Sequence, residues 1–124
     1  MAEEKTGKAI SKRNLPREVK ISIKASQAKK GEDLIVLDLR GISSFTDYFV
    51  IMHGNSTRQN LALQESIEKE LKKEKTVPLS IEGKELGEWI LMDYGSFIIH
   101  VFSEKAREYY SLEKLWGDAQ KLSY

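Results

Sequence analysis

Hydrophobic side chains recur along this chain at two spacings, and the change between them marks the predicted elements. A helix face with one hydrophobic residue in every four is formed first by Leu15, Val19 and Ile23. Hydrophobic residues also alternate from Val19 to Ile23, as in a strand, but Pro16 suits the first turn of a helix. We therefore predict a helix that Asn14 caps and that Gly31 ends in the left-handed conformation.

Two continuous hydrophobic runs follow, and they predict strands that are buried on both faces. The first run covers residues 34–39, in which Asp38 is the one charged residue, and Arg40 follows it directly. The second run covers residues 48–53. Helical spacing returns from Thr57 to Lys73, which is the longest predicted helix. Asn55 or Ser56 can cap this helix.

The remaining chain predicts three short strands and two short helices. The strands lie near residues 79–81, 89–93 and 97–102, and the helices begin after Ser103 and Ser111, which we expect to cap them. Alternation in the second strand places Trp89, Leu91 and Asp93 on one face and Ile90, Met92 and Tyr94 on the other. Gly95-Ser96 predicts a tight hairpin between the last two strands.

These elements predict a single α/β domain over residues 15–124, with a mixed sheet of about five strands flanked by α-helices. A long helix between buried strands implies a crossover and therefore parallel pairing, whereas the hairpin adds antiparallel pairs. Residues 1–14 are polar and have no sustained period, so we expect a flexible N-terminal tail.

Composition limits the function without naming it. The 20 basic and 19 acidic residues give a net charge of +1, which lacks the global basic excess of a DNA-binding protein. There is no cysteine for a disulfide or a thiolate metal site, and the hydrophobic runs are too short to span a membrane. We expect a cytoplasmic protein, and Glu3 and Glu4 argue against an organellar transit peptide.

Motifs for catalysis are missing from the sequence. The two histidines, His53 and His100, have no second ligand at metal spacing, and no phosphate-binding glycine loop occurs. Asp38 and Asp47 are not followed by a second acid in the pattern that two-metal sites use. We therefore expect no catalytic residue, no metal and no cofactor, and we interpret His100, inside a hydrophobic strand, as structural.

Local charge leaves one candidate surface. Lysines between Lys69 and Lys75 alternate with glutamates, which is typical of a solvated helix face. Residues 80–95 instead carry an acidic excess with Trp89 at its centre, formed by Glu82, Glu85, Glu88 and Asp93 against Lys84. From the residues alone, Trp89 fits the core as well as it fits an interface for a basic partner.

A set of motifs in one order carries a resemblance to a known family. The motifs are Leu37-Asp38-Leu39-Arg40-Gly41, Thr46-Asp47-Tyr48-Phe49-Val50-Ile51, Gly54-Asn55-Ser56, Ile81-Glu82-Gly83, Trp89-Ile90-Leu91-Met92-Asp93-Tyr94-Gly95, His100-Val101-Phe102, Arg107-Glu108-Tyr109-Tyr110 and Leu112-Glu113-Lys114-Leu115-Trp116. Together they resemble the ribosomal silencing factor family, also called the RsfS or Iojap family. Two positions depart from its pattern, because Gln59 and Ser96 stand where members often carry a histidine and an acid.

The resemblance implies a fold similar to nucleotidyltransferases without their catalytic acids. It implies a translation repressor that binds a basic protein on the intersubunit face of the large ribosomal subunit and blocks association with the small subunit. It also implies a possible homodimer when the protein is free. Trp89 matches the family's docking tryptophan, and the neighbouring candidates are Glu82, Leu91, Asp93 and Tyr94.

Two alternatives remain open at this point. One is a nucleotidyltransferase-like enzyme, which would need Mg²⁺ and a nucleotide near Asp38 and Asp47. The other is an assembly factor that binds ribosomal RNA through the N-terminal tail and the lysines of residues 69–75.

Overall fold

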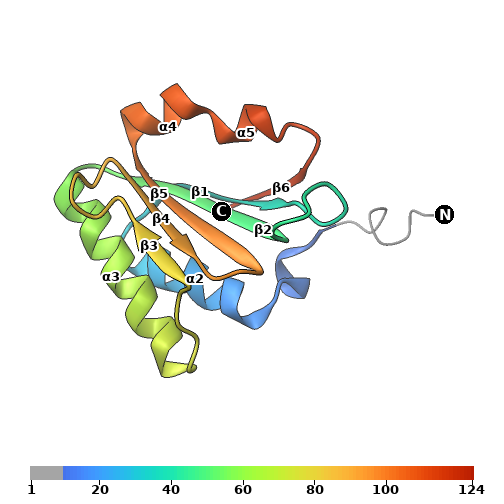
Figure 1. The fold of residues 1–124 in the computed structure, drawn as a ribbon, viewed down its shortest axis with the longest axis horizontal. Helices are drawn as coiled ribbons and strands as arrows, with labels where there is room; N and C mark the ends of the chain where they lie inside the picture. Colours follow the sequence, from blue (N-terminus) through green and yellow to red (C-terminus); the bar gives the residue numbers. More distant parts are fainter. Residues whose placement is uncertain (1–9) are drawn as a thin grey trace.

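The computed structural model describes residues 10–124 and places one six-stranded sheet between two helical layers (Figure 1). Its elements in chain order are η1 (Lys12–Asn14), α2 (Arg17–Ala28), β1 (Glu32–Asp38), β2 (Tyr48–Gly54), α3 (Thr57–Lys73), β3 (Ser80–Glu82), β4 (Trp89–Asp93), β5 (Phe97–Ser103), α4 (Glu104–Tyr110), α5 (Leu112–Leu115) and β6 (Gln120–Ser123). Most of the predicted N-terminal tail, residues 1–9, lies outside the described residues, and a short 3-10 turn forms from Lys12 to Asn14.

The strand order is β3-β4-β5-β2-β1-β6, and this confirms the predicted mixed sheet. β2 and β5 pair in parallel, while the other neighbouring strands are antiparallel. The parallel partner of β2 is therefore not the next strand in the chain, because β3 and β4 lie beyond β5. β6, which the sequence did not predict, pairs with β1 at the opposite edge.

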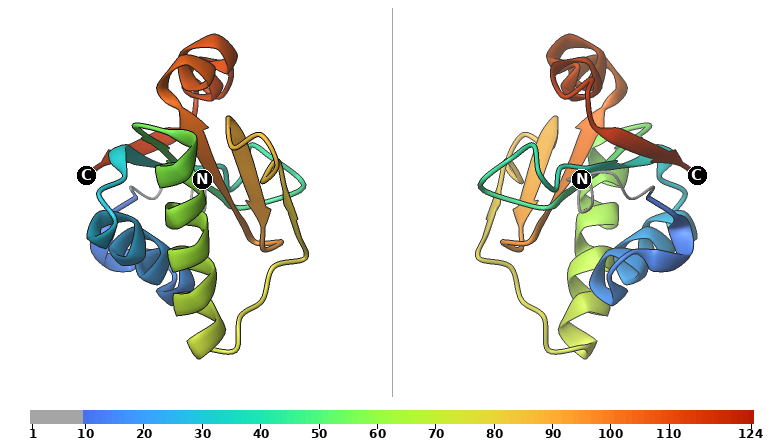
Figure 2. Two further views of the ribbon diagram at one scale, coloured as in Figure 1. Left: turned by 90° about the vertical axis from the view of Figure 1, so that its left-hand side faces the viewer. Right: turned by 90° about the vertical axis from the view of Figure 1, so that its right-hand side faces the viewer.

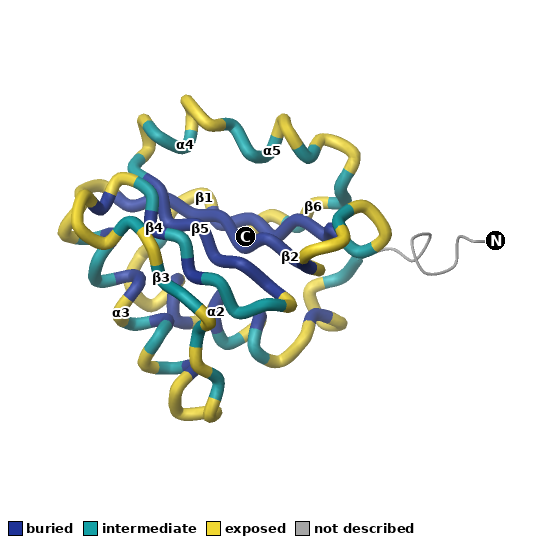
Figure 3. Tube along the Cα trace, in the orientation of Figure 1, coloured by how far each residue is buried: buried dark blue, intermediate teal, exposed yellow. Residues whose placement is uncertain are grey.

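Each face of the sheet carries its own hydrophobic core. α2 and α3 cover one face, and α4 and α5 lie over part of the other (Figures 1 and 2). The core between the sheet and α2 and α3 includes Val19, Ile23, Leu63, Ile67, Val50 and Ile99. The core on the opposite face of the sheet includes Leu37, Phe49, Ile51 and Phe102. The central strands β1, β2 and β5 are buried along most of their length (Figure 3). None of the described helices is both long and apolar enough to cross a membrane.

Two predicted helix caps are confirmed and a third is wrong. The hydroxyl of Ser56 accepts a hydrogen bond from the Gln59 amide at 3.0 Å, and the hydroxyl of Ser103 accepts one from the Ala106 amide at 3.1 Å. Ser111 does not cap α5, because its φ of 47° places it in the left-handed region that ends α4. Its hydroxyl donates instead to the carbonyl of Glu108 at 2.7 Å.

The predicted ends of the first helix are also wrong. Pro16, rather than Asn14, precedes α2, and it makes no side-chain cap. The left-handed residue at the other end is Lys30, with φ 61°, rather than Gly31. At Gly31 a Cβ would lie 3.3 Å from side-chain atoms of both Leu63 and Met52, a tight contact that these side chains would have to relieve.

Candidate partner-binding surface

Trp89, Leu91 and Asp93 lie on the same face of β4, as the alternation predicted. All three are partly exposed, whereas the intervening Ile90 and Met92 are fully buried. This face lies away from α2 and α3, and Trp89 and Leu91 pack against the second core. The sequence left Trp89 open between core and interface, and in the structure its ring belongs to both.

Trp89 is the inner member of an aromatic group that reaches the surface. Its ring centroid lies 5.0 Å from that of Phe102, which is fully buried, and 4.5 Å from that of Tyr110 on α4. Tyr110 in turn meets Tyr109 edge to face at 5.0 Å. Tyr110 is 48% exposed and Tyr109 is 81% exposed. The two tyrosine rings therefore extend the aromatic group from the Trp89 indole to the protein surface.

A hydrogen bond fixes the orientation of the Trp89 indole. Its Nε1–H donates to Nδ1 of His100 at 3.1 Å, across the β4–β5 pair. Burial lowers the pKa of the His100 imidazole to about 3, so the ring is neutral at physiological pH. Since Nδ1 accepts, the ring proton is on Nε2. The prediction of a hydrogen-bonded structural histidine is confirmed, and its partner is the candidate docking residue.

The neighbouring acids do different things. Asp93 accepts a hydrogen bond from the Gly95 amide at 2.8 Å, which stabilises the β4–β5 turn. Glu82 lies on the edge strand β3, directly opposite Leu91, and is exposed. In an antiparallel pair, opposite residues share a face, so Glu82 stands beside Leu91. Of these two carboxylates, Glu82 is therefore the freer to meet a partner.

Tyr94 is the one candidate that the structure separates from the others. It packs toward the core under α2 and α3, and its ring stacks on Phe97 with centroids 4.9 Å apart. Its hydroxyl is buried without a hydrogen-bond partner among the described residues. Burial, together with the charge of Glu68, raises the pKa of this phenol to about 12.

The surface also includes residues outside the list of candidates, of which Glu85 and Glu88 belong to the acidic stretch that the sequence indicated. The turn between β3 and β4 exposes Glu85, Glu88 and Leu86, of which Leu86 is 78% exposed. Tyr109 and Tyr110 were quoted only as a motif, and the contact of Tyr110 with Trp89 depends on how α4 folds back over β5. We call Trp89, Tyr109, Tyr110, Leu91 and Glu82 the aromatic-acidic face.

Comparison with known proteins identifies the family. A family model described as "Ribosomal silencing factor during starvation" (RsfS) matches residues 12–124, which is nearly the whole chain. The chain belongs to the RsfS family. A ribosomal silencing factor of Bacillus subtilis is 42% identical over 101 residues, covering 82% of this chain and 86% of that protein.

Solved structures and a mitochondrial relative extend the family assignment. A crystal structure of a Chromobacterium violaceum protein superposes with a TM-score of 0.79 at 37% identity, covering 81% of this chain and 83% of that one. A mouse protein named for mitochondrial assembly of the ribosomal large subunit is 37% identical over 91 residues. This match covers 71% of the RsfS-family chain but only 40% of the mouse protein.

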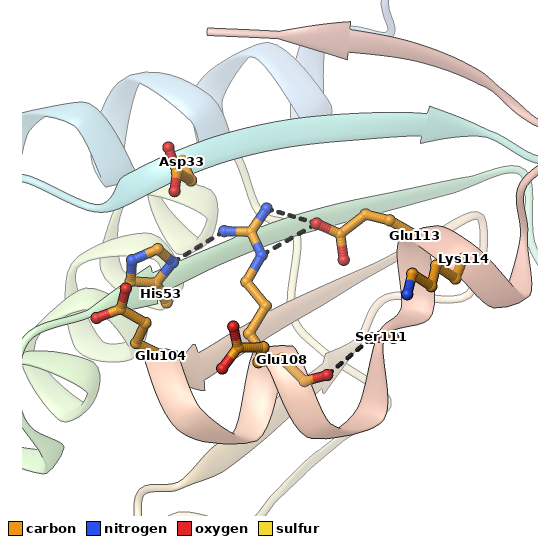
Figure 4. A pocket seen from close by; sticks show the side chains of 8 residues that line it. Asp33, His53, Glu104, Glu108, Ser111, Glu113 and Lys114 are labelled. Carbon is orange, nitrogen blue, oxygen red and sulfur yellow. Dashed lines mark hydrogen bonds and ion pairs between the residues drawn. The ribbon is translucent and has the colours of Figure 1, made fainter.

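A cavity of about 310 Å³ in this RsfS-family chain is lined by residues of β1, β2, α4 and α5 (Figure 4). His53 and Arg107 lie in it among four acids, Asp33, Glu104, Glu108 and Glu113. The Arg107 guanidinium donates to Glu113 at 2.9 and 3.1 Å, and it meets Nδ1 of His53 at 3.0 Å. These contacts tie α4 and α5 to β2, so the two most buried polar groups of the cavity are engaged in holding the C-terminal segment.

Asp38, one of the two acids on which the enzyme alternative rests, is held by Arg40. Asp38 receives two hydrogen bonds from the Arg40 guanidinium, at 2.9 and 2.8 Å, and one from the Arg40 amide. The bond to Asp38 raises the pKa of the Arg40 side chain above its usual value. No group of three or more potential metal ligands occurs within residues 10–124.

Proposed function

We propose that this RsfS-family protein binds the large ribosomal subunit through the aromatic-acidic face and prevents the small subunit from joining it. The observation that carries the proposal is the position of Trp89. Its indole is fixed by His100 and continues into exposed tyrosines, in a chain whose relatives are named as ribosomal silencing factors. Half-buried aromatic residues held in one orientation are typical of binding hot spots.

Charge supports a basic protein as the direct partner. Glu82, Glu85 and Glu88 are exposed around the β3–β4 turn, and Lys84 is the one basic residue among them. An acidic rim around an aromatic centre fits a partner that presents lysine or arginine beside an apolar pocket. The rim increases the association rate and sets orientation, whereas the aromatic centre supplies most of the affinity.

The mechanism is steric, and no bond is made or broken. A domain of this size bound on the intersubunit face occupies volume that the small subunit needs, so translation is repressed while the factor stays bound. We place this action in the cytoplasm, where the two subunits meet. In the free protein, the exposed rings of Tyr109 and Tyr110 make the same face a candidate for homodimer contact.

Joining of purified subunits tests the proposal. Light scattering follows 70S-type particle formation after small subunits are added to large subunits with increasing amounts of the protein. We expect suppression that saturates near one protein per large subunit and that is lost for Trp89→Ala. Unchanged joining at saturating protein would refute the steric mechanism. Calorimetry with Mg²⁺ and nucleoside triphosphates would then test the nucleotidyltransferase-like alternative.

A further inference from the structure

Charge is distributed very unevenly along this nearly neutral chain. Residues 11–30 hold seven basic residues, namely Lys12, Arg13, Arg17, Lys20, Lys24, Lys29 and Lys30, and one acid, Glu18. This segment therefore has a net charge of +6, which leaves −5 for the rest of a chain whose total is +1. A total charge near zero thus conceals a strongly basic segment, and local charge, not the total, governs binding to polyanions.

Three of these basic residues lie on the outer surface of α2, and the other four flank the helix in the chain. The helix buries Val19 and Ile23 against the sheet, and its exposed positions include Arg17, Lys20 and Lys24. Separations of three and four residues place them on one face. Lys29 and Lys30 follow directly after the C-terminal end of α2, and both are exposed. Figure 2 shows α2 on the opposite side of the molecule from β3 and β4.

Most of these cations form no ion pair with another residue of the described part of the chain. Arg17 forms an ion pair with Glu74 at 3.0 Å, and Lys12 lies over the Tyr124 ring at 4.3 Å. Glu70 borders the same groove as Lys24, but its carboxylate binds Lys73 at 3.1 Å. Within residues 10–124, no carboxylate lies within 4 Å of the five other cations, which are Arg13, Lys20, Lys24, Lys29 and Lys30.

The basic surface is also held in place. The side-chain amide of Gln59, at the start of α3, donates to the carbonyls of Lys29 and Lys30 at 3.2 Å each. The end of α2 is thereby fixed to α3, while the two ammonium groups remain free in solvent. An anionic partner would therefore meet charges whose backbone is already ordered, which lowers the entropic cost of binding.

We propose that the exposed basic residues on α2 and at its two ends, Arg13, Lys20, Lys24, Lys29 and Lys30, bind the phosphate backbone of RNA, and we call this surface the α2 face. Lysine is a point charge suited to phosphates, and contacts of this kind are independent of sequence. No large hydrophobic side chain is exposed between Lys12 and Lys30, which is unlike a helix that binds at a membrane surface. The face is distinct from the lysines of residues 69–75, where glutamates alternate.

This inference goes beyond the proposed function, since it concerns a second surface that does not include Trp89. The aromatic-acidic face suits a basic protein, whereas the α2 face suits a polyanion, and the two lie on opposite sides of the sheet. A chain bound to both would have its orientation fixed by two contacts of opposite charge. Loss of either contact should leave the other measurable in isolation.

Fluorescence anisotropy with a labelled RNA hairpin of arbitrary sequence tests the proposal in the full-length protein. If about four phosphates are neutralised, the logarithm of the binding constant should fall with the logarithm of salt concentration with a slope of about −3. That slope corresponds to about a 60-fold loss of affinity between 50 and 200 mM salt. The double variant Lys20→Glu/Lys24→Glu should make this slope less negative by about two. The double variant Lys20→Gln/Lys24→Gln, which removes the two charges without reversing them, should have the same effect.

A control of equal charge separates the α2 face from a general effect. Lys105→Glu/Lys121→Glu changes the net charge of the protein by the same amount at exposed positions outside α2, and it should leave the slope unchanged. Equal losses in both glutamate variants, or no loss in the α2 variants, would overturn the proposal. Trp89→Ala should bind the hairpin normally, so failure at the large subunit and failure at the α2 face are distinguishable.

Discussion

Replacing Trp89 with alanine should weaken both the fold and the binding, and the structure predicts how much of each. Truncation of a fully buried tryptophan costs about 3–5 kcal/mol, and Trp89 is only partly buried, so we expect a loss of about 2–3 kcal/mol of unfolding free energy. The loss includes the contacts with Phe102 and Tyr110 and the hydrogen bond to His100. A domain with a stability of about 5–15 kcal/mol stays folded.

The loss of binding should exceed what instability explains. A hot-spot aromatic contributes about 2–4 kcal/mol, so the affinity for large subunits should fall about 30- to 1000-fold. Urea unfolding followed by circular dichroism measures the first effect. Cosedimentation of the labelled protein with purified large subunits measures the second. It is done without urea, at a temperature where wild type and Trp89→Ala are both folded.

The chain provides a matched control in its other tryptophan. Trp116 is also partly buried against the same core, with its ring centroid 6.0 Å from that of Phe49 and 6.2 Å from that of Phe45. Trp116→Ala should therefore cost similar stability and leave binding to the large subunit intact. Equal loss of binding in both variants would show that stability alone is responsible, and normal binding by folded Trp89→Ala would refute the assigned site.

Three further tests address the scaffold behind this surface. His100 has a lowered pKa in the folded state, so its contribution to stability is complete above about pH 6.5. Below that pH the contribution is lost at about 1.4 kcal/mol per pH unit as the unfolded state binds a proton. Urea unfolding from pH 7 to 5 should therefore show a steeper loss of unfolding free energy in wild type than in His100→Gln. Gly83→Ala would drive a Cβ into the backbone of β4, whereas Gly95→Ala, also at positive φ, has its nearest neighbour at 3.6 Å; the first should lower the thermal midpoint clearly more than the second. Arg107→Gln should reduce stability by about 2 kcal/mol. Its effect should be non-additive with that of Glu113→Gln in a double-mutant cycle because the two residues form one partly buried ion pair; additive losses would contradict that coupling.

Hydrophobic spacing was sufficient for most of the fold but not for its edges. The buried strands and α3 contain enough hydrophobic residues to fix their type and approximate limits. β6 was missed because Gln120–Ser123 carries a single large hydrophobic residue, Leu122, and becomes a strand through its pairing with β1. The left-handed end of α2 was predicted one residue too late, at Gly31, because glycine adopts that conformation most easily. In the structure Lys30 adopts it, and Gly31 instead packs closely against neighbouring side chains.

The candidate site was only partly accessible from sequence for a related reason. Alternation correctly grouped Trp89 with Leu91, and it placed Tyr94 on the opposite face. The hydrogen bond to His100 and the contact with Tyr110 join residues 11 and 21 positions away, so they depend on strand register and on the path of α4. The α2 face was hidden because its charge is cancelled by acids elsewhere in the chain.

The position of β5 at the centre of the sheet has a consequence for the order of events during synthesis. β5 lies between β4 and β2, which have no contact of their own in the strand order, and it ends at Ser103 of 124 residues. While the ribosome is still making the protein, the earlier strands therefore lack their common neighbour. Stable folding must therefore wait for β5, and until then the edges of β2 and β4 that β5 will cover stay unpaired.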